Sequence, residues 1–107
     1  MSITRYNTVL SKIAVGTTVG ASDSIPFADY AGGEVYIPAA SSITTLTWWG
    51  SDDGVTYYAI QDGAGTAVQS IDLAASEACP IPDECFGCAY LRAVGNAAGT
   101  VKLTLKG

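Results

Sequence analysis

Hydrophobic and polar residues alternate along several short stretches of this chain, with the two-residue period that is typical of β-strands. The clearest case is residues 100–106, where Val101, Leu103 and Leu105 alternate with threonine and lysine residues. One side of this segment is therefore expected to face a core and the other side to face water.

Residues 43–60, ITTLTWWGSDDGVTYYAI, predict a β-hairpin. In its first arm the adjacent residues Trp48 and Trp49 must point to opposite faces of a regular strand. Residues 51–54, SDDG, have turn chemistry, because aspartate side chains bond to nearby backbone N–H groups and glycine adopts a positive φ. The second arm, 55–60, returns to β-branched and aromatic residues, so Tyr57 and Tyr58 are also expected to face opposite ways.

The remaining strands are less regular. They are expected at 8–15, 24–28, 34–38, 66–73 and 89–94, after an N-terminal arm at 1–10. Pro26 indicates an edge strand or a bulge, and Pro80 and Pro82 restrict residues 74–84 to a helical turn at most. Seven to nine short strands without an amphipathic helix predict one all-β domain, 1–107: an antiparallel β-sandwich of the jelly-roll or immunoglobulin-like type.

Composition excludes several classes of protein. Hydrophobic residues make up 49% of the 107 residues and charged residues 14%, which argues against disorder. The formal charge of −5 and five scattered basic residues argue against a nucleic-acid partner. No apolar run approaches the length of a membrane span and the N-terminus has no signal-peptide pattern, so we expect a protein that is made in a cytoplasm and has no membrane partner.

The residues that carry most catalytic chemistry are scarce. Histidine, the commonest general base and metal ligand, does not occur in the sequence. The paired carboxylates Asp52-Asp53 and Asp83-Glu84 are adjacent in sequence, so each pair is expected to point apart, and turn chemistry explains the first pair better. We therefore expect no enzyme, no catalytic residue and no cofactor.

Three cysteines, Cys79, Cys85 and Cys88, lie in the segment CPIPDECFGC. We expect reduced, buried thiols and no metal site. Two alternatives stay open. One is a zinc site that uses Cys85 and Cys88 with Asp83 or Glu84, or that forms between chains. The other is a disulfide within the segment.

Aromatic residues are the main candidates for binding. An outward Trp49 beside an outward Tyr58 would form a platform that stacks on a sugar ring or anchors a protein contact, and burial against protein is the favoured alternative. The candidate interaction surface consists of Trp49, Tyr58, Tyr36, Arg5 and Tyr6.

Residues 34–107 contain a succession of motifs: an aromatic strand, an S-x-D-G turn, a second aromatic strand, a proline-bounded loop with a phenylalanine, a strand with Leu-Arg and a terminal Gly-Thr-Val strand. The residues in these places are Trp48, Ser51, Asp53, Gly54, Tyr57, Pro82, Phe86, Leu91, Arg92, Gly99, Thr100 and Val101. This order of motifs resembles small structural proteins of tailed bacteriophages, which tend to have the same succession. The cysteine cluster departs from the pattern.

The resemblance implies a virion component on the capsid exterior, a head decoration or cement protein that binds and stabilises the outer shell. Its partners would be the major capsid protein and neighbouring copies of itself, with a trimer expected at local three-fold positions. Two alternatives remain: a phage tail or neck adaptor, and a carbohydrate-binding module that uses the Trp49 and Tyr58 platform.

Overall fold

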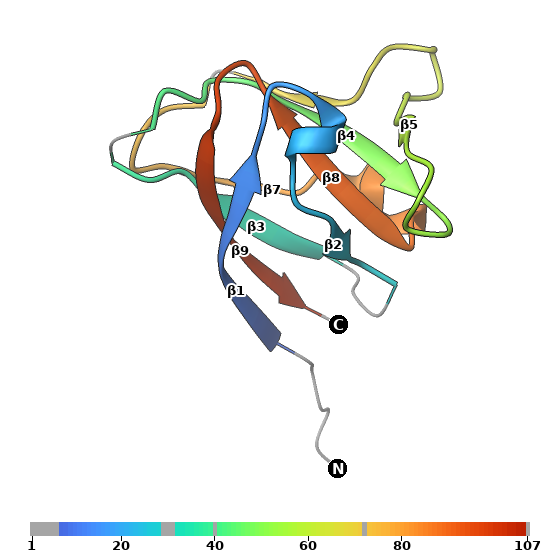
Figure 1. Ribbon diagram of the computed structural model, residues 1–107, viewed down its shortest axis with the longest axis horizontal. Coiled ribbons are helices and arrows are strands. Elements are labelled where there is room, and N and C mark those ends of the chain that lie inside the picture. Colours follow the sequence, from blue (N-terminus) through green and yellow to red (C-terminus); the bar gives the residue numbers. More distant parts are fainter. Residues whose placement is uncertain (1–6, 29–31, 40, 72, 107) are drawn as a thin grey trace.

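The structure, a computed structural model, describes residues 7–28, 32–39, 41–71 and 73–106. Within these ranges the chain is all-β, with nine strands in two antiparallel sheets and two short 3-10 helices (Figure 1). The expected single-domain β-sandwich is confirmed in its class: the two sheets pack on one hydrophobic core. No helix among the described residues is long and apolar enough to cross a membrane.

The first sheet has four strands in the order β1-β9-β3-β7. Their bounds are Asn7–Val15 for β1, Gly99–Lys106 for β9, Gly32–Tyr36 for β3 and Ala78–Pro80 for β7. The two longest strands, β1 and β9, pair along their whole length, with a shift in register between Leu10 and Ile13. In β9 the expected alternation is confirmed, because Val101, Leu103 and Leu105 are all buried.

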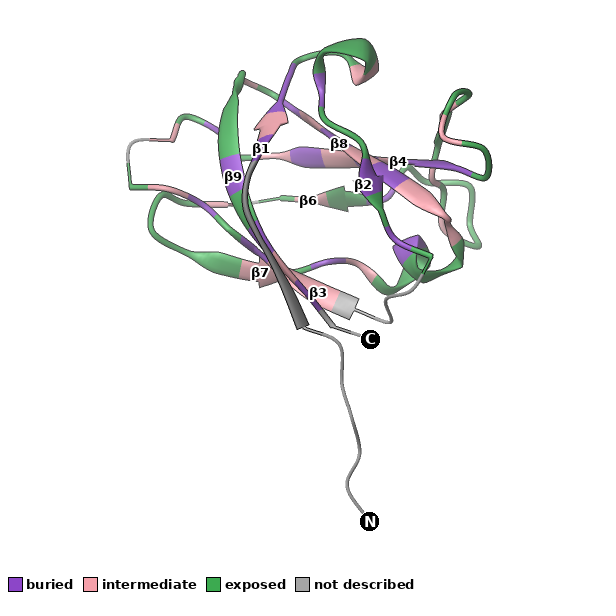
Figure 2. Cartoon of the chain, turned by 60° about the horizontal axis from the view of Figure 1, so that its bottom comes forward, coloured by how far each residue is buried: buried purple, intermediate pink, exposed green. Residues whose placement is uncertain are grey.

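The second sheet has the path β2-β8-β4-β5, with β6 also paired to β4. Its strands are Ile25–Pro26 for β2, Tyr90–Gly95 for β8, Leu46–Ser51 for β4, Tyr58–Ala59 for β5 and Gln69–Ser70 for β6. Pro26 lies in the edge strand β2, as its missing N–H predicts. Figure 2 shows buried and less buried residues following one another along β4 and β8.

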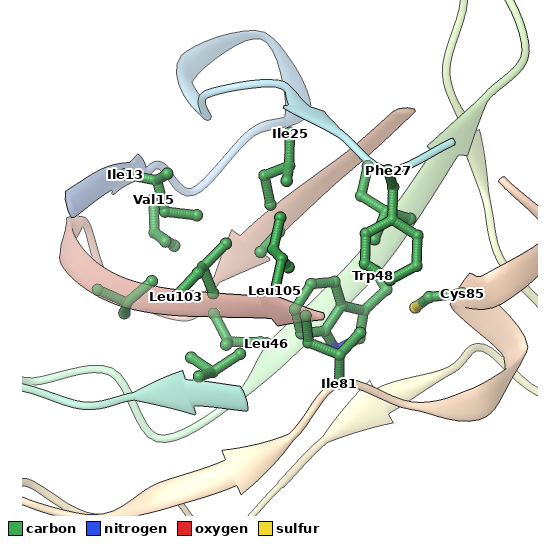
Figure 3. Packing of buried hydrophobic residues seen from close by; sticks show 14 of the residues in the cluster. Ile13, Val15, Ile25, Phe27, Leu46, Trp48, Ile81, Cys85, Leu103 and Leu105 are labelled. Carbon is green, nitrogen blue, oxygen red and sulfur yellow. The ribbon is translucent and has the colours of Figure 1, made fainter. Parts of the chain in front are cut away.

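The core fills the space between the sheets. Trp48 is fully buried, and its indole Nε1 donates a hydrogen bond to Ser70 Oγ at 3.0 Å, so the polar atom of this large side chain has a partner. Figure 3 shows Trp48 among side chains from both sheets and from the loops that follow β2 and β7. The labelled members of this cluster are Ile13, Val15, Ile25, Phe27, Leu46, Ile81, Cys85, Leu103 and Leu105.

Several expected elements are shorter than the pattern indicated. The second hairpin arm, expected at 55–60, is strand only at Tyr58–Ala59, and Val55 is 83% exposed. The strand expected at 66–73 is reduced to Gln69–Ser70. In the hairpin, Asp53 accepts the backbone N–H groups of Val55 and Thr56, which holds those residues out of the ladder. In the other segment, Ala67 forms an isolated bridge with Gln61 around the Asp62 turn, separate from Gln69–Ser70.

The segment 74–84 differs most from expectation. It contains the strand β7, which the sequence did not predict, because Pro80 disfavours a central strand; β7 lies at the sheet edge, where proline is tolerated. The helical turn forms instead at Asp83–Gly87 as the 3-10 helix η2. The other 3-10 helix, η1, spans Val19–Ala21 within the loop of small residues after β1.

Candidate functional site

The register of the β4–β5 hairpin decides where its aromatic side chains lie. Trp49 pairs with Ala59, and Gly50 pairs with Tyr58. Directly opposed residues of an antiparallel pair share one face of the sheet, and successive residues alternate. Trp49 and Tyr58 therefore lie on opposite faces of the sheet, and the prediction that they form one stacking platform is wrong. The sequence pattern predicts how side chains alternate between the two faces within each arm of the hairpin. It does not predict which residue of one arm pairs with which residue of the other, because the turn sets that register.

The outer face of the second sheet carries a cluster around Arg92. Trp49, half-buried, pairs across the strands with Arg92. The Arg92 guanidinium carbon lies 4.5 Å from the centroid of the Tyr57 ring, and Arg92 Nη1 donates a hydrogen bond of 2.8 Å to the Val19 carbonyl. The Tyr57 hydroxyl in turn shares a hydrogen bond with the Ser24 hydroxyl. The tyrosine on the same face as Trp49 and Arg92 is thus Tyr57. Its ring contacts Arg92 and its hydroxyl contacts Ser24, so both contacts are with residues of this chain.

A groove of about 390 Å³ opens at one end of the second sheet. It lies between the β4–β5 hairpin and the chain that leaves η2, which are close together in Figure 1. Tyr58 stands at this groove and is 66% exposed. The lining residues are Gly50, Ser51, Asp52, Tyr58, Ala59, Ile60, Gly87, Cys88 and Ala89. We call this feature the end groove.

Gly50 and Cys88 form a close contact at the end groove. A Cβ atom added to Gly50 would overlap the Cys88 sulfur and would lie 3.3 Å from the Ile60 side chain. Glycine therefore lets the thiol lie directly against strand β4, a close approach that often explains a glycine within a strand.

Exposed apolar side chains flank the groove residues in the sequence. Val55 precedes Tyr58 in the hairpin, and Phe86 precedes the groove residue Gly87. Phe86 is 41% exposed, and its ring packs against buried Phe27 with the centroids 6.1 Å apart. Tyr58 at the groove and the exposed side chains of the flanking segments offer apolar area, which suits contact with another protein.

The turn at the rim of the end groove is stabilised by Asp53. Its Oδ1 accepts hydrogen bonds from the N–H groups of Val55 at 2.8 Å and Thr56 at 3.0 Å, and from the Ser51 hydroxyl at 3.0 Å. These donors, that of Thr56 first, lower the pKa of Asp53 below its ordinary value of 3.8. Gly54 has the φ of 78° that the turn chemistry predicted. Asp53 thus has a structural role, as the sequence indicated.

The three cysteines are free thiols. Burial raises the pKa of Cys85 to about 12, with further contributions from Cys88 and Glu84. Burial also raises the pKa of Cys88, and burial together with Glu34 raises that of Cys79. All three thiols are therefore protonated near neutral pH, and a protonated thiol is a poor nucleophile and a poor metal ligand.

The described residues do not assemble a metal site. Over the ranges that the structure describes, no group of three or more histidine, cysteine, aspartate or glutamate residues lies close enough to hold an ion. The zinc alternative for Cys85 and Cys88 with Asp83 or Glu84 therefore has no geometric support in these residues.

The five predicted surface residues do not form one surface. Trp49 is on the outer face of the second sheet, and Tyr58 is at the end groove. Tyr36, 42% exposed, pairs with Lys102 in the first sheet, on the side opposite to buried Val35. The two other candidates, Arg5 and Tyr6, lie outside the described residues. The sequence did not predict the end groove, because the groove joins residues 50–60 to residues 87–89, which are distant in the chain. The available signal was Gly50, a glycine within the predicted hairpin.

Comparisons with known proteins do not extend this description. No protein family, no curated protein and no solved structure matches this chain.

Proposed function

We propose that this chain is a non-enzymatic structural protein of a virion, a head decoration protein that binds the outer shell of a tailed bacteriophage and stabilises it. The observation that carries the proposal is the end groove of the β-sandwich with its exposed Tyr58, together with exposed Val55 and Phe86 in the segments that flank the groove residues in the sequence. The motif order from residue 34 to residue 107, which resembles phage structural proteins, supplies the identity of the partner.

The chemistry of the end groove favours recognition over catalysis. Its thiol, Cys88, has a raised pKa and stays protonated near neutral pH, so it is a poor nucleophile. Tyr58 offers a ring and a hydroxyl group, the combination that anchors many protein interfaces. A side chain from a shell protein would fill the groove while Tyr58 packs against it.

Binding of this kind stabilises a shell without any reaction. A protein that binds the assembled shell but not its dissociated subunits adds RT ln(1 + [L]/Kd) per site, which is about 2.7 kcal/mol when the free concentration is 100 times Kd. Particles stripped of the protein should therefore burst at a lower temperature than decorated particles. An unchanged burst temperature would count against the proposal.

The first experiment is to count the copies of this chain in purified source particles by quantitative mass spectrometry, relative to the major shell protein. A number comparable to that of the shell protein supports decoration of the whole lattice. A few to a few tens of copies supports the alternative, a tail or neck adaptor. If the chain does not occur in particles, the virion proposal is wrong.

The second experiment tests the surface. Tyr58→Ala should weaken binding to stripped particles by tenfold or more, as expected for an interface anchor. Ile71→Ala is the matched control, because Ile71 is also exposed, at 61%, but follows β6, whose partner in β4 is Leu46 at the far end from Gly50. Equal binding by the two variants would place the contact elsewhere.

A further inference from the structure

The outer edge of strand β1 has two different halves. In its C-terminal half, Ala14 donates its N–H to Asp23 Oδ2 at 2.7 Å and accepts the Asp23 N–H at 3.0 Å. The Ser22 hydroxyl likewise accepts the Gly16 N–H at 3.0 Å. The loop after β1 therefore takes the place of a neighbouring strand and closes this half of the edge.

The bonds of Ala14 identify which backbone groups of β1 point away from β9. Ala14 pairs with Thr100, and its N–H and C=O are directed to Asp23, away from β9. Val9 pairs with Thr104, which is four residues from Thr100 on β9. Hydrogen-bonded and non-hydrogen-bonded pairs alternate along an antiparallel ladder, so pairs an even number of β9 residues apart are of the same kind. The backbone groups of Val9 therefore point away from β9, as those of Ala14 do. The same holds for Asn7, which pairs with Lys106.

The N-terminal half of this edge is open. Among the described strands, β9 alone pairs with β1, which is the last strand of its sheet (Figure 1), so no strand covers the outward N–H and C=O groups of Asn7 and Val9. The other sheet edges are short or carry proline: β2 contains Pro26, β7 contains Pro80, and β5 has two residues. Proline, short length, charged residues and bulges are the usual protections of an edge strand. In β1 the register shift and Lys12 lie beyond Leu10, so residues 7–10 have none of these protections.

We propose that the open edge of β1 pairs with the same edge of a second copy of this chain. Two β1 strands related by a two-fold axis run antiparallel, so the outward backbone groups of one copy meet those of the other. An axis through Val9 places Val9 opposite its own copy and Asn7 opposite Ser11 of the second copy. The two four-stranded sheets then continue into one.

The second copy is favoured over another partner by closure. A contact about a two-fold axis occupies both open edges at once, so pairing stops at two chains. In this register the outward groups of Val9 meet the same groups of the second copy, so the edge is complementary to itself. This dimer differs from the trimer that the phage resemblance implies, and it is independent of any shell.

The native mass of the free protein tests the pairing. Native mass spectrometry or light scattering should give twice the chain mass of 11.0 kDa. Val9→Pro should return the chain to a monomer, because it removes an N–H that the fold does not use but the contact does. Val9→Thr keeps that N–H and should stay dimeric. A monomeric wild type, or a Val9→Pro oligomer of unchanged mass, would overturn the proposal.

A cross-link tests the position of the axis without relying on the folding of the proline variant. Opposed residues of a hydrogen-bonded antiparallel pair have Cα atoms about 5.5 Å apart, within the usual range for a disulfide. Oxidised Val9→Cys should therefore form a covalent dimer at least tenfold faster than Ala98→Cys, an exposed control in the β8–β9 turn. Equal rates for the two variants would refute the axis at Val9. Because no particles are involved, failure here leaves the decoration proposal untouched.

Discussion

Arg92 lies over the ring of Tyr57, with its guanidinium carbon 4.5 Å from the ring centroid, and joins strand β8 to the β4–β5 hairpin and to the loop before β2. These contacts fix the outer face of the second sheet. Arg92 Nη1 also donates to the Val19 carbonyl, and a hydrogen bond from a charged donor contributes about 1.5–3 kcal/mol.

Arg92→Met should lower the free energy of unfolding by about 1–3 kcal/mol, because it removes both the bond to Val19 and the contact with Tyr57. Urea denaturation followed by tryptophan fluorescence measures the change. Lys102→Met, an exposed cation in the first sheet, is the control and should stay within about 0.5 kcal/mol. If both variants are equally stable, the cluster has no structural role.

Gly50→Ala should destabilise the protein by about 1–3 kcal/mol, because its new Cβ overlaps the Cys88 sulfur. Cys88→Ala removes that sulfur, so the loss caused by Gly50→Ala should be smaller in the Cys88→Ala background, a coupling that a double-mutant cycle measures. Gly63→Ala, where a Cβ meets nothing within 4 Å, should be close to neutral. Purely additive losses would contradict the contact.

Asp53 should make part of the stability depend on acid pH. Its pKa is lower in the folded state, so the charged carboxylate stabilises the fold above the ordinary value of 3.8, and this contribution is lost as the pH falls through the lower folded value. Asp53→Asn should therefore have a lower Tm than the wild type at pH 6, and the difference should shrink below pH 3.8. Asp52→Asn, an exposed neighbour, provides the control. A Tm difference that is constant with pH would contradict this role.

Cys85 should be the slowest of the three thiols to react. Its side chain is fully buried and its pKa is raised to about 12, whereas Cys79 and Cys88 are half-buried. At pH 8 in native conditions, mass spectrometry after alkylation should find Cys79 and Cys88 modified before Cys85, while denaturant should equalise the three rates. Early modification of Cys85 would contradict its place in the core.

The same thiol should limit stability at alkaline pH. A folded pKa raised from 9.0 to about 12 means that the contribution of neutral Cys85 is complete below pH 9 and is lost as the pH rises from 9 toward 12. Cys85→Val removes this titration, so its Tm should fall less steeply over that interval. Parallel Tm curves for the two proteins would argue that other groups cause the alkaline loss.

Much of the fold follows from local pattern. The alternation of β9, the Asp53-Gly54 turn and the edge position of Pro26 were all predictable, because each depends on residues within a few positions of one another. A two-residue period already decides which side chains of a strand share a face. The β-sandwich class follows from many such strands without an amphipathic helix.

The tertiary structure alone decided how those strands meet. It placed Trp49 and Tyr58 on opposite faces, brought Cys88 against Gly50, and paired the unexpected strand β7 with β3. It also left the outer groups of Val9 open while Asp23 closed those of Ala14. Register and strand order depend on groups that lie far apart in the chain. The sequence by itself therefore determined most of the strands and the face of each side chain within them. Long-range pairing determined β7, the groove, the edge and the surfaces that a partner can reach.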